Sequence, residues 1–186
     1  MPVNNSSKLN LDWEAAYFKL RSVDNEYYTL KDLSGENGTV IVFICNHCPY
    51  VVSIANRLKY EADELKKIKI NTISIMSNDT LAYPEDSFDN MKIFSKKYNF
   101  NFPYLIDEDQ SVAIKYGAVC TPDFFGFNKF LKLQYRGRID SKIMKTEEKN
   151  TNRDLYNAMV MISKTDKGPT KQYNSFGCSI KWKQND

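Results

Sequence analysis

The chain has 186 residues, enough for one domain that buries about 70% of the surface exposed by its unfolded form. Its 26 Lys and Arg residues nearly balance its 23 Asp and Glu residues, and no basic cluster is interleaved with aromatic residues, so we expect no nucleic-acid partner. No stretch approaches 18 consecutive apolar residues, and residues 1–12 lack the basic start and apolar run of a secretory signal. These features predict no membrane segment and a cytoplasmic location.

The first part of the chain predicts a flexible leader followed by a β-hairpin. Residues 1–10 are polar and form the expected leader. Residues 16–20 and 26–30 have the pattern of two short strands, and Asp24 and Asn25 between them suit a turn. Residues 30–38 then lead, as a loop rich in glycine, to the next strand.

The strongest signal is a buried strand that ends in two cysteines. Residues 39–44 are almost all β-branched or aromatic, as in a strand covered on both faces. Cys45-Asn46-His47-Cys48 follows, and Pro49 predicts the start of a helix, since proline at the first helical position loses no hydrogen bond. Apolar residues at three- and four-residue steps continue this helix to about Lys67.

A Cys-x-x-Cys pair on a strand-to-helix turn predicts thiol redox chemistry. The unsatisfied N–H groups of a helix N-terminus favour a thiolate over a thiol. We expect Cys45 to be the exposed nucleophile and Cys48 its partner, and the single histidine, His47, to lower the thiolate pKa when protonated. In a reducing compartment a close pair is more typical of catalysis than of a disulfide scaffold, so the pattern indicates an oxidoreductase that needs no cofactor.

The same cluster allows a second interpretation, a metal site. Cys45, His47 and Cys48 include soft thiolate donors that suit Cu(I), so the alternative function is copper binding or delivery. Three ligands within four residues are cramped, and no second Cys-x-x-Cys or histidine pair completes a tetrahedral set. Structural zinc is therefore disfavoured.

The rest of the chain alternates between strands and helices. A strand at 68–76 follows the first helix, which indicates a right-handed parallel crossover. Asp86 or Ser87 is expected to cap a helix that runs to Tyr98. The later elements are a strand at 102–106, a short helix ending at Gly117, antiparallel strands at 124–128 and 131–136, and a helix at 151–162 capped by Thr151 or Asn152. Residues 163–186 end in apolar and aromatic side chains, which predicts an extension packed on the domain.

This order of elements resembles the thioredoxin fold, an α/β fold whose central mixed sheet is flanked by helices. Several short motifs are similar to those of peroxiredoxin-like redoxins of the alkyl hydroperoxide reductase and thiol-specific antioxidant group: residues 43–49, 77–79, 83–84, 120–125, 135–140 and 177–182. The resemblance covers about residues 16–162, and with the chain length it implies one redoxin domain, 1–186, that reduces hydroperoxides or exchanges disulfides. It also implies an external reductant, either a thioredoxin-type protein or a small thiol, and allows a homodimer.

The resemblance also assigns residues to the site. It implies that the Thr121–Pro122 bond is cis and faces the cysteines, with the Thr121 backbone free to pair with an extended protein substrate. A thioredoxin alignment makes Cys45 the nucleophile, whereas a peroxiredoxin alignment gives that role to Cys48, and the sequence leaves the choice open. Further candidates are an arginine near the thiolate, Arg136 or Arg138, and an accessory or resolving cysteine, Cys120 or Cys178.

Overall fold

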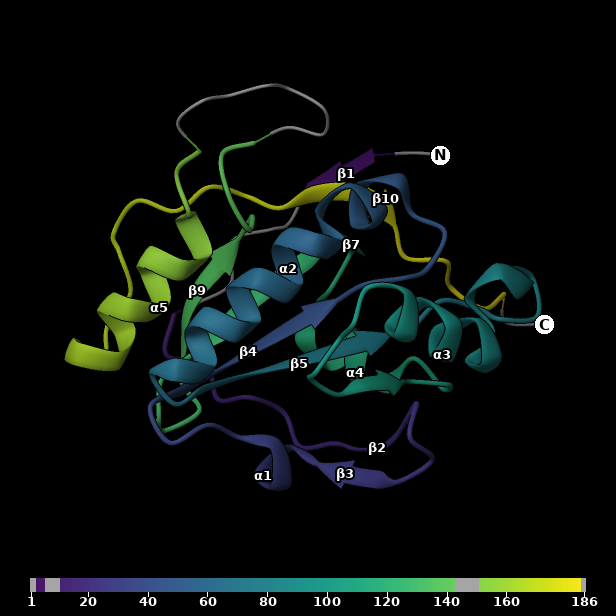
Figure 1. Cartoon of the computed structure of the whole chain (residues 1–186), viewed down its shortest axis with the longest axis horizontal. Helices are drawn as coiled ribbons and strands as arrows, with labels where there is room; N and C mark the ends of the chain where they lie inside the picture. Colours follow the sequence, from purple (N-terminus) through teal and green to yellow (C-terminus); the bar gives the residue numbers. More distant parts are fainter. Residues whose placement is uncertain (1–2, 6–10, 143–150, 185–186) are drawn as a thin grey trace.

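The computed structural model describes residues 3–5, 11–142 and 151–184, and a mixed β-sheet lies at its centre (Figure 1). Seven strands of the described residues form this sheet, in the order β3-β2-β6-β5-β4-β8-β9. Their bounds are β2 Lys19–Ser22, β3 Tyr27–Thr29, β4 Gly38–Phe43, β5 Ile70–Met76, β6 Tyr104–Ile106, β8 Asp123–Phe127 and β9 Leu133–Gly137. Strands β4, β5 and β6 are parallel, and the other pairs are antiparallel.

Helices cover both faces of the sheet (Figure 1). Along β4, Val40 and Val42 belong to one core cluster and Ile41 and Phe43 to the other, because successive strand residues point to opposite faces. The first cluster receives the apolar faces of α2 Pro49–Lys67, α3 Phe88–Lys97 and α5 Asp154–Thr165. The second receives those of α1 Leu30–Leu33 and α4 Ser111–Tyr116. The thioredoxin-like α/β class expected from the sequence is confirmed.

A second, smaller sheet lies near the N-terminal end of α2 (Figure 1). It contains β1 Val3–Asn5, β10 Phe176–Ser179 and β7 Cys120–Thr121, in the order β1-β10-β7 and with both pairs antiparallel. Residues 3–5, which were expected to belong to a flexible leader, therefore form a strand. The other leader residues, 1–2 and 6–10, lie outside the described part of the chain.

Most predicted elements are present, with shifted ends. The hairpin of β2 and β3 is confirmed, and α2 begins at Pro49 and ends at Lys67 as predicted. The expected loop after residue 30 instead starts with α1, which has a capping box formed by Thr29 and Asp32. The predicted caps Thr151 and Asn152 are wrong, because α5 starts at Asp154 and its N-cap residue is Arg153. The Asp154 carboxylate accepts a hydrogen bond from Arg138.

Candidate active site

The two cysteines flank the turn that joins β4 to α2. Their side chains are buried, with exposed fractions of 1% for Cys45 and 0% for Cys48. The expectation that Cys45 is exposed is therefore wrong, because Thr121 of β7, in the second sheet, lies against both sulfurs. Both thiols are reduced, and any substrate must reach a buried sulfur.

Thr121 contacts both cysteines. The Thr121–Pro122 peptide bond is cis, as the resemblance implies. The Thr121 hydroxyl lies 3.4 Å from the Cys45 sulfur, and in its neutral form the Cys48 thiol donates a hydrogen bond to the Thr121 carbonyl at 3.1 Å. A single residue of β7 thus contacts both sulfurs, one through its side chain and one through its backbone.

The backbone edge at Thr121 is already occupied. β10 pairs with β7 so that Cys178 lies opposite Thr121 and Ser179 opposite Cys120. The contact is close, since a Cβ atom added to Gly177 would lie 2.0 Å from the Thr121 carbonyl oxygen. The predicted free edge for a protein substrate is therefore wrong, because the C-terminal segment of the same chain fills that position.

Cys48 is the thiol whose surroundings favour the negative charge. Hydrogen bonds from the Cys45 thiol, from the Val51 backbone N–H in the first turn of α2, and from the thiol and backbone of Cys178 together lower the pKa of Cys48 to about 5. Burial opposes this shift, but it is outweighed because several donors converge on one sulfur. When Cys48 is protonated, its thiol donates a hydrogen bond to the Thr121 carbonyl, which favours the neutral form less than the several donors favour the thiolate. Cys48 is therefore a thiolate near neutral pH.

Cys45 has the opposite character. Its hydrogen bond to Cys48, its burial and the nearby Asp86 carboxylate raise its pKa well above that of a free thiol. The Thr121 hydroxyl has the opposite but weaker effect on this pKa. The pair thus holds one negative charge, on Cys48, with the Cys45 thiol donating to it. The lowered thiol pKa expected from the helix-terminus argument is thus found at Cys48 rather than at Cys45, because Cys48 is the N-cap residue of α2.

Asp86 is the residue of this site that the sequence did not reveal, because it was considered only as a helix cap. Ser87 caps α3, whereas Asp86 ends the short 3₁₀ helix Pro84–Asp86 and is fully buried. Its carboxylate accepts hydrogen bonds from the backbone N–H groups of Asn46 and His47 at 2.8 and 3.3 Å and from the Asn78 side chain at 2.7 Å. Asp86 thereby holds the turn between the cysteines.

The side chains of His47 and Asn46 contact residues other than the two cysteines. The His47 Nδ1 atom lies 2.7 Å from Asp86 Oδ2, and the ring stacks on Tyr83. Asn46 accepts a hydrogen bond from the buried hydroxyl of Tyr104. The expectation that His47 lowers the thiolate pKa is therefore not supported, since His47 pairs with a carboxylate instead.

The donors that could hold a metal ion differ from the predicted set. Among the described residues, ligand atoms of Cys45, His47 and Asp86 all lie within 4.8 Å of one another, and Cys48 is not part of this group. The predicted cluster of Cys45, His47 and Cys48 is thus not assembled. Cys48 instead faces Thr121 and β10.

The two arginines proposed as accessory residues both form ion pairs with carboxylates. Arg138 binds Asp154 at 2.7 Å, and Arg136 forms a buried ion pair with Asp123 at 2.8 Å. Both guanidinium groups are thus engaged in ion pairs that hold the fold.

The two remaining cysteines differ in their surroundings. The Cys120 thiol points to the Pro122 carbonyl, and burial raises its pKa. Cys178 is 2% exposed and hydrogen-bonds to Cys48, and its pKa is raised to about 12 by burial and by that neighbour.

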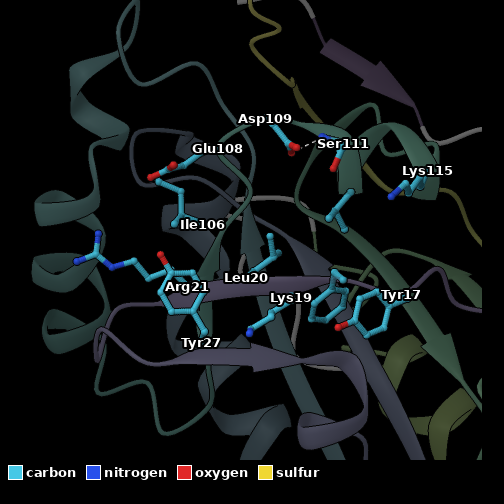
Figure 2. A pocket seen from close by; sticks show the side chains of 12 residues that line it. Tyr17, Lys19, Leu20, Arg21, Tyr27, Ile106, Glu108, Asp109, Ser111 and Lys115 are labelled. Atoms are coloured by element: carbon cyan, nitrogen blue, oxygen red, sulfur yellow. Dashed lines mark hydrogen bonds between the residues drawn. The ribbon is translucent and has the colours of Figure 1, made fainter.

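The most spacious of the pockets described here lies away from the cysteines, beside β2 and α4. It has a volume of about 380 Å³, and Figure 2 shows basic residues Lys19, Arg21 and Lys115 and acidic residues Glu108 and Asp109 among its lining side chains. No cysteine or histidine lines it. It therefore offers no thiol chemistry.

The hollows near the thiols are shallower or smaller. One is lined by Asn46 and His47 and by residues of α3, and another lies beside Tyr50, Pro122 and Phe176.

No helix in the described ranges is long and apolar enough to cross a membrane.

Comparison with known proteins identifies the family. The sequence profile of the AhpC/TSA family matches residues 12–137. The chain belongs to the AhpC/TSA family. It is also 38% identical to an uncharacterised conserved protein from Geobacillus kaustophilus, with a TM-score of 0.95 over 100% of this chain and 99% of the other. No curated protein matches the sequence significantly.

More distant structures share the fold of this AhpC/TSA protein. Peroxidoxin BcpB from Mycobacterium tuberculosis is 15% identical, with a TM-score of 0.60 over 84% of this chain and 96% of the other. A secreted M. tuberculosis disulfide oxidoreductase homologous to E. coli DsbE is 17% identical, with a TM-score of 0.58 over 77% and 95%. These two structures show that the chain has the thioredoxin fold. Membership of the AhpC/TSA family makes it an oxidoreductase with thiol redox chemistry.

Proposed function

We propose that this AhpC/TSA protein reduces hydroperoxides, with Cys48 as the attacking thiolate and Cys45 as the resolving thiol. The observation that carries the proposal is the environment of Cys48, a buried sulfur at the N-terminus of α2 whose pKa is lowered to about 5. A thiolate in this setting is a ready nucleophile at neutral pH. Cys45 is the neighbouring thiol in the right position to react with oxidised Cys48.

The occupied edge at Thr121 favours a small substrate over a protein disulfide. An extended polypeptide would need the backbone hydrogen bonds that β10 already makes with β7. A hydroperoxide needs no such backbone pairing, since only its terminal oxygen must reach the Cys48 sulfur.

The reaction is balanced by the two thiols. The Cys48 thiolate attacks the terminal peroxide oxygen and breaks the O–O bond, and the alcohol leaves after taking up one proton, so that Cys48 becomes a sulfenic acid. The Cys45 thiol then displaces water and forms the Cys45–Cys48 disulfide. Two thiols are oxidised and one hydroperoxide is reduced to an alcohol and water.

The cycle requires an external reductant. A thioredoxin-type protein or a low-molecular-weight thiol would return the disulfide to two thiols by exchange. A cytoplasmic location and a homodimer remain predictions from the sequence.

Two assays on the reduced protein test the choice of substrate. We expect consumption of cumene hydroperoxide in the presence of dithiothreitol, and little reduction of insulin disulfides at the same protein concentration. The result follows from the thiolate at Cys48 and the covered edge at Thr121. Insulin reduction without peroxide consumption would contradict the proposal. A tight stoichiometric Cu(I) complex with neither activity would favour the copper alternative.

A further inference from the structure

We propose that Asp86 is the positioning residue that assigns the two thiols their roles: it fixes the turn between them and places a negative charge beside Cys45. This inference rests on the proposed function, because it explains why Cys48 attacks and Cys45 resolves. Asp86 does not need to touch the substrate, since it acts through the two cysteines.

The contacts of Asp86 hold the turn rigidly. One carboxylate oxygen accepts from two consecutive N–H groups, those of Asn46 and His47, which lie between the cysteines. The other oxygen accepts from Asn78 and lies against the His47 ring. A fully buried carboxylate that spans two peptide groups leaves the turn few alternative conformations.

The negative charge of Asp86 lies close to the Cys45 thiol. A carboxylate oxygen of Asp86 and the Cys45 sulfur lie within 4.8 Å of each other, and both groups are buried. Two negative charges at this separation repel strongly where water is excluded. Cys48 lies outside this group of closely spaced ligand atoms and is the N-cap residue of α2, so the single charge of the pair is more stable on Cys48.

Asn78 connects this arrangement to the C-terminal segment. The Asn78 side chain donates to Asp86 and accepts a hydrogen bond from the Lys181 backbone N–H at 2.9 Å. The same segment pairs with Thr121 through β10. The cysteine turn, Asp86 and the C-terminal segment thus form one hydrogen-bonded network around the two thiols.

Asp86→Asn removes the charge while keeping an oxygen for the Asn46 and His47 N–H groups. Its new amide would face the Asn78 amide, so a second variant combines Asp86→Asn with Asn78→Asp. The double variant keeps one carboxylate and its hydrogen bond to the neighbouring amide, but moves the charge to position 78. Comparison of the two separates the effect of the charge from that of packing.

The readout is the ratio of iodoacetamide labelling at Cys45 and Cys48 near pH 7, measured by peptide mass spectrometry. We expect the wild-type protein to be labelled at Cys48, and the ratio of Cys45 to Cys48 labelling to rise about tenfold or more in both variants, as a relative shift of one pKa unit produces. An unchanged ratio in a folded double variant would overturn the role of Asp86.

The labelling assay needs no peroxide, so it can fail separately from the proposed function. If labelling changes as expected but the wild-type protein consumes no hydroperoxide, Asp86 still assigns the thiolate and only the substrate is wrong. If peroxide is consumed and the labelling ratio does not move, the reaction stands and the inference about Asp86 falls.

Discussion

Cys48→Ser is expected to reduce hydroperoxide turnover to background, a loss on the order of a thousandfold or more, because a serine hydroxyl is not ionised where the Cys48 thiolate is. Cys45→Ser should behave differently. It should reduce one equivalent of peroxide at a rate within roughly threefold of the wild-type protein, since the serine hydroxyl can replace the Cys45 thiol as a donor to Cys48. It should then stop with a sulfenic acid on Cys48.

Rapid-mixing measurements with stoichiometric peroxide, followed by dimedone trapping, distinguish the two variants. The account predicts a dimedone adduct on Cys48 in the Cys45→Ser protein and no adduct in the Cys48→Ser protein. An adduct on Cys45 in the Cys48→Ser protein, with peroxide turnover retained, would show that the roles are the reverse.

Displacing β10 is expected to turn the protein toward protein disulfides. In Gly177→Ala the added methyl group would lie 2.0 Å from the Thr121 carbonyl oxygen, so β10 must move away from β7. The uncovered edge can then pair with an extended substrate, and we expect insulin reduction to increase by about tenfold. Peroxide reduction should fall, because Cys48 loses its hydrogen bonds from Cys178.

Gly168→Ala is the matched control for this variant. Its methyl group would also clash with a backbone oxygen, that of Gln134 at 1.9 Å, but far from Thr121 in the sequence and outside β10. It should perturb the C-terminal segment without raising insulin reduction. Equal gains in the two variants, or no gain in Gly177→Ala, would contradict a role for β10 in excluding polypeptides.

The fold and the location of the site could be predicted from local signals. The apolar run at 39–44, the cysteine pair and Pro49 lie next to one another in the chain, and each has a direct local consequence. The cis bond at Thr121–Pro122 followed from the resemblance. These features are encoded within a few residues, so periodicity and motif were sufficient to find them.

The difference in pKa between the two thiols could not be predicted, because it depends on distant residues. Asp86 is 40 positions from Asn46, whose N–H it binds, and nothing in the sequence marks it as more than a helix cap. Cys178 is also distant in the sequence, and the pairing of β10 with β7 brings it next to Cys48. A helix N-terminus does lower the pKa of a nearby thiol, as expected from the sequence. Because α2 starts at Pro49, the N-cap position belongs to Cys48, and the pKa of Cys48 is the one that is lowered.

The most direct test of this account is a pH titration of thiolate absorbance at 240 nm in the wild-type, Cys45→Ser and Cys48→Ser proteins. Because the folded pKa of Cys48 is depressed to about 5, the thiolate should be present near neutral pH and lost as the pH falls through about 5. The account predicts that this transition persists in Cys45→Ser and is absent from Cys48→Ser. A low-pH transition that persists in Cys48→Ser and disappears in Cys45→Ser would contradict it.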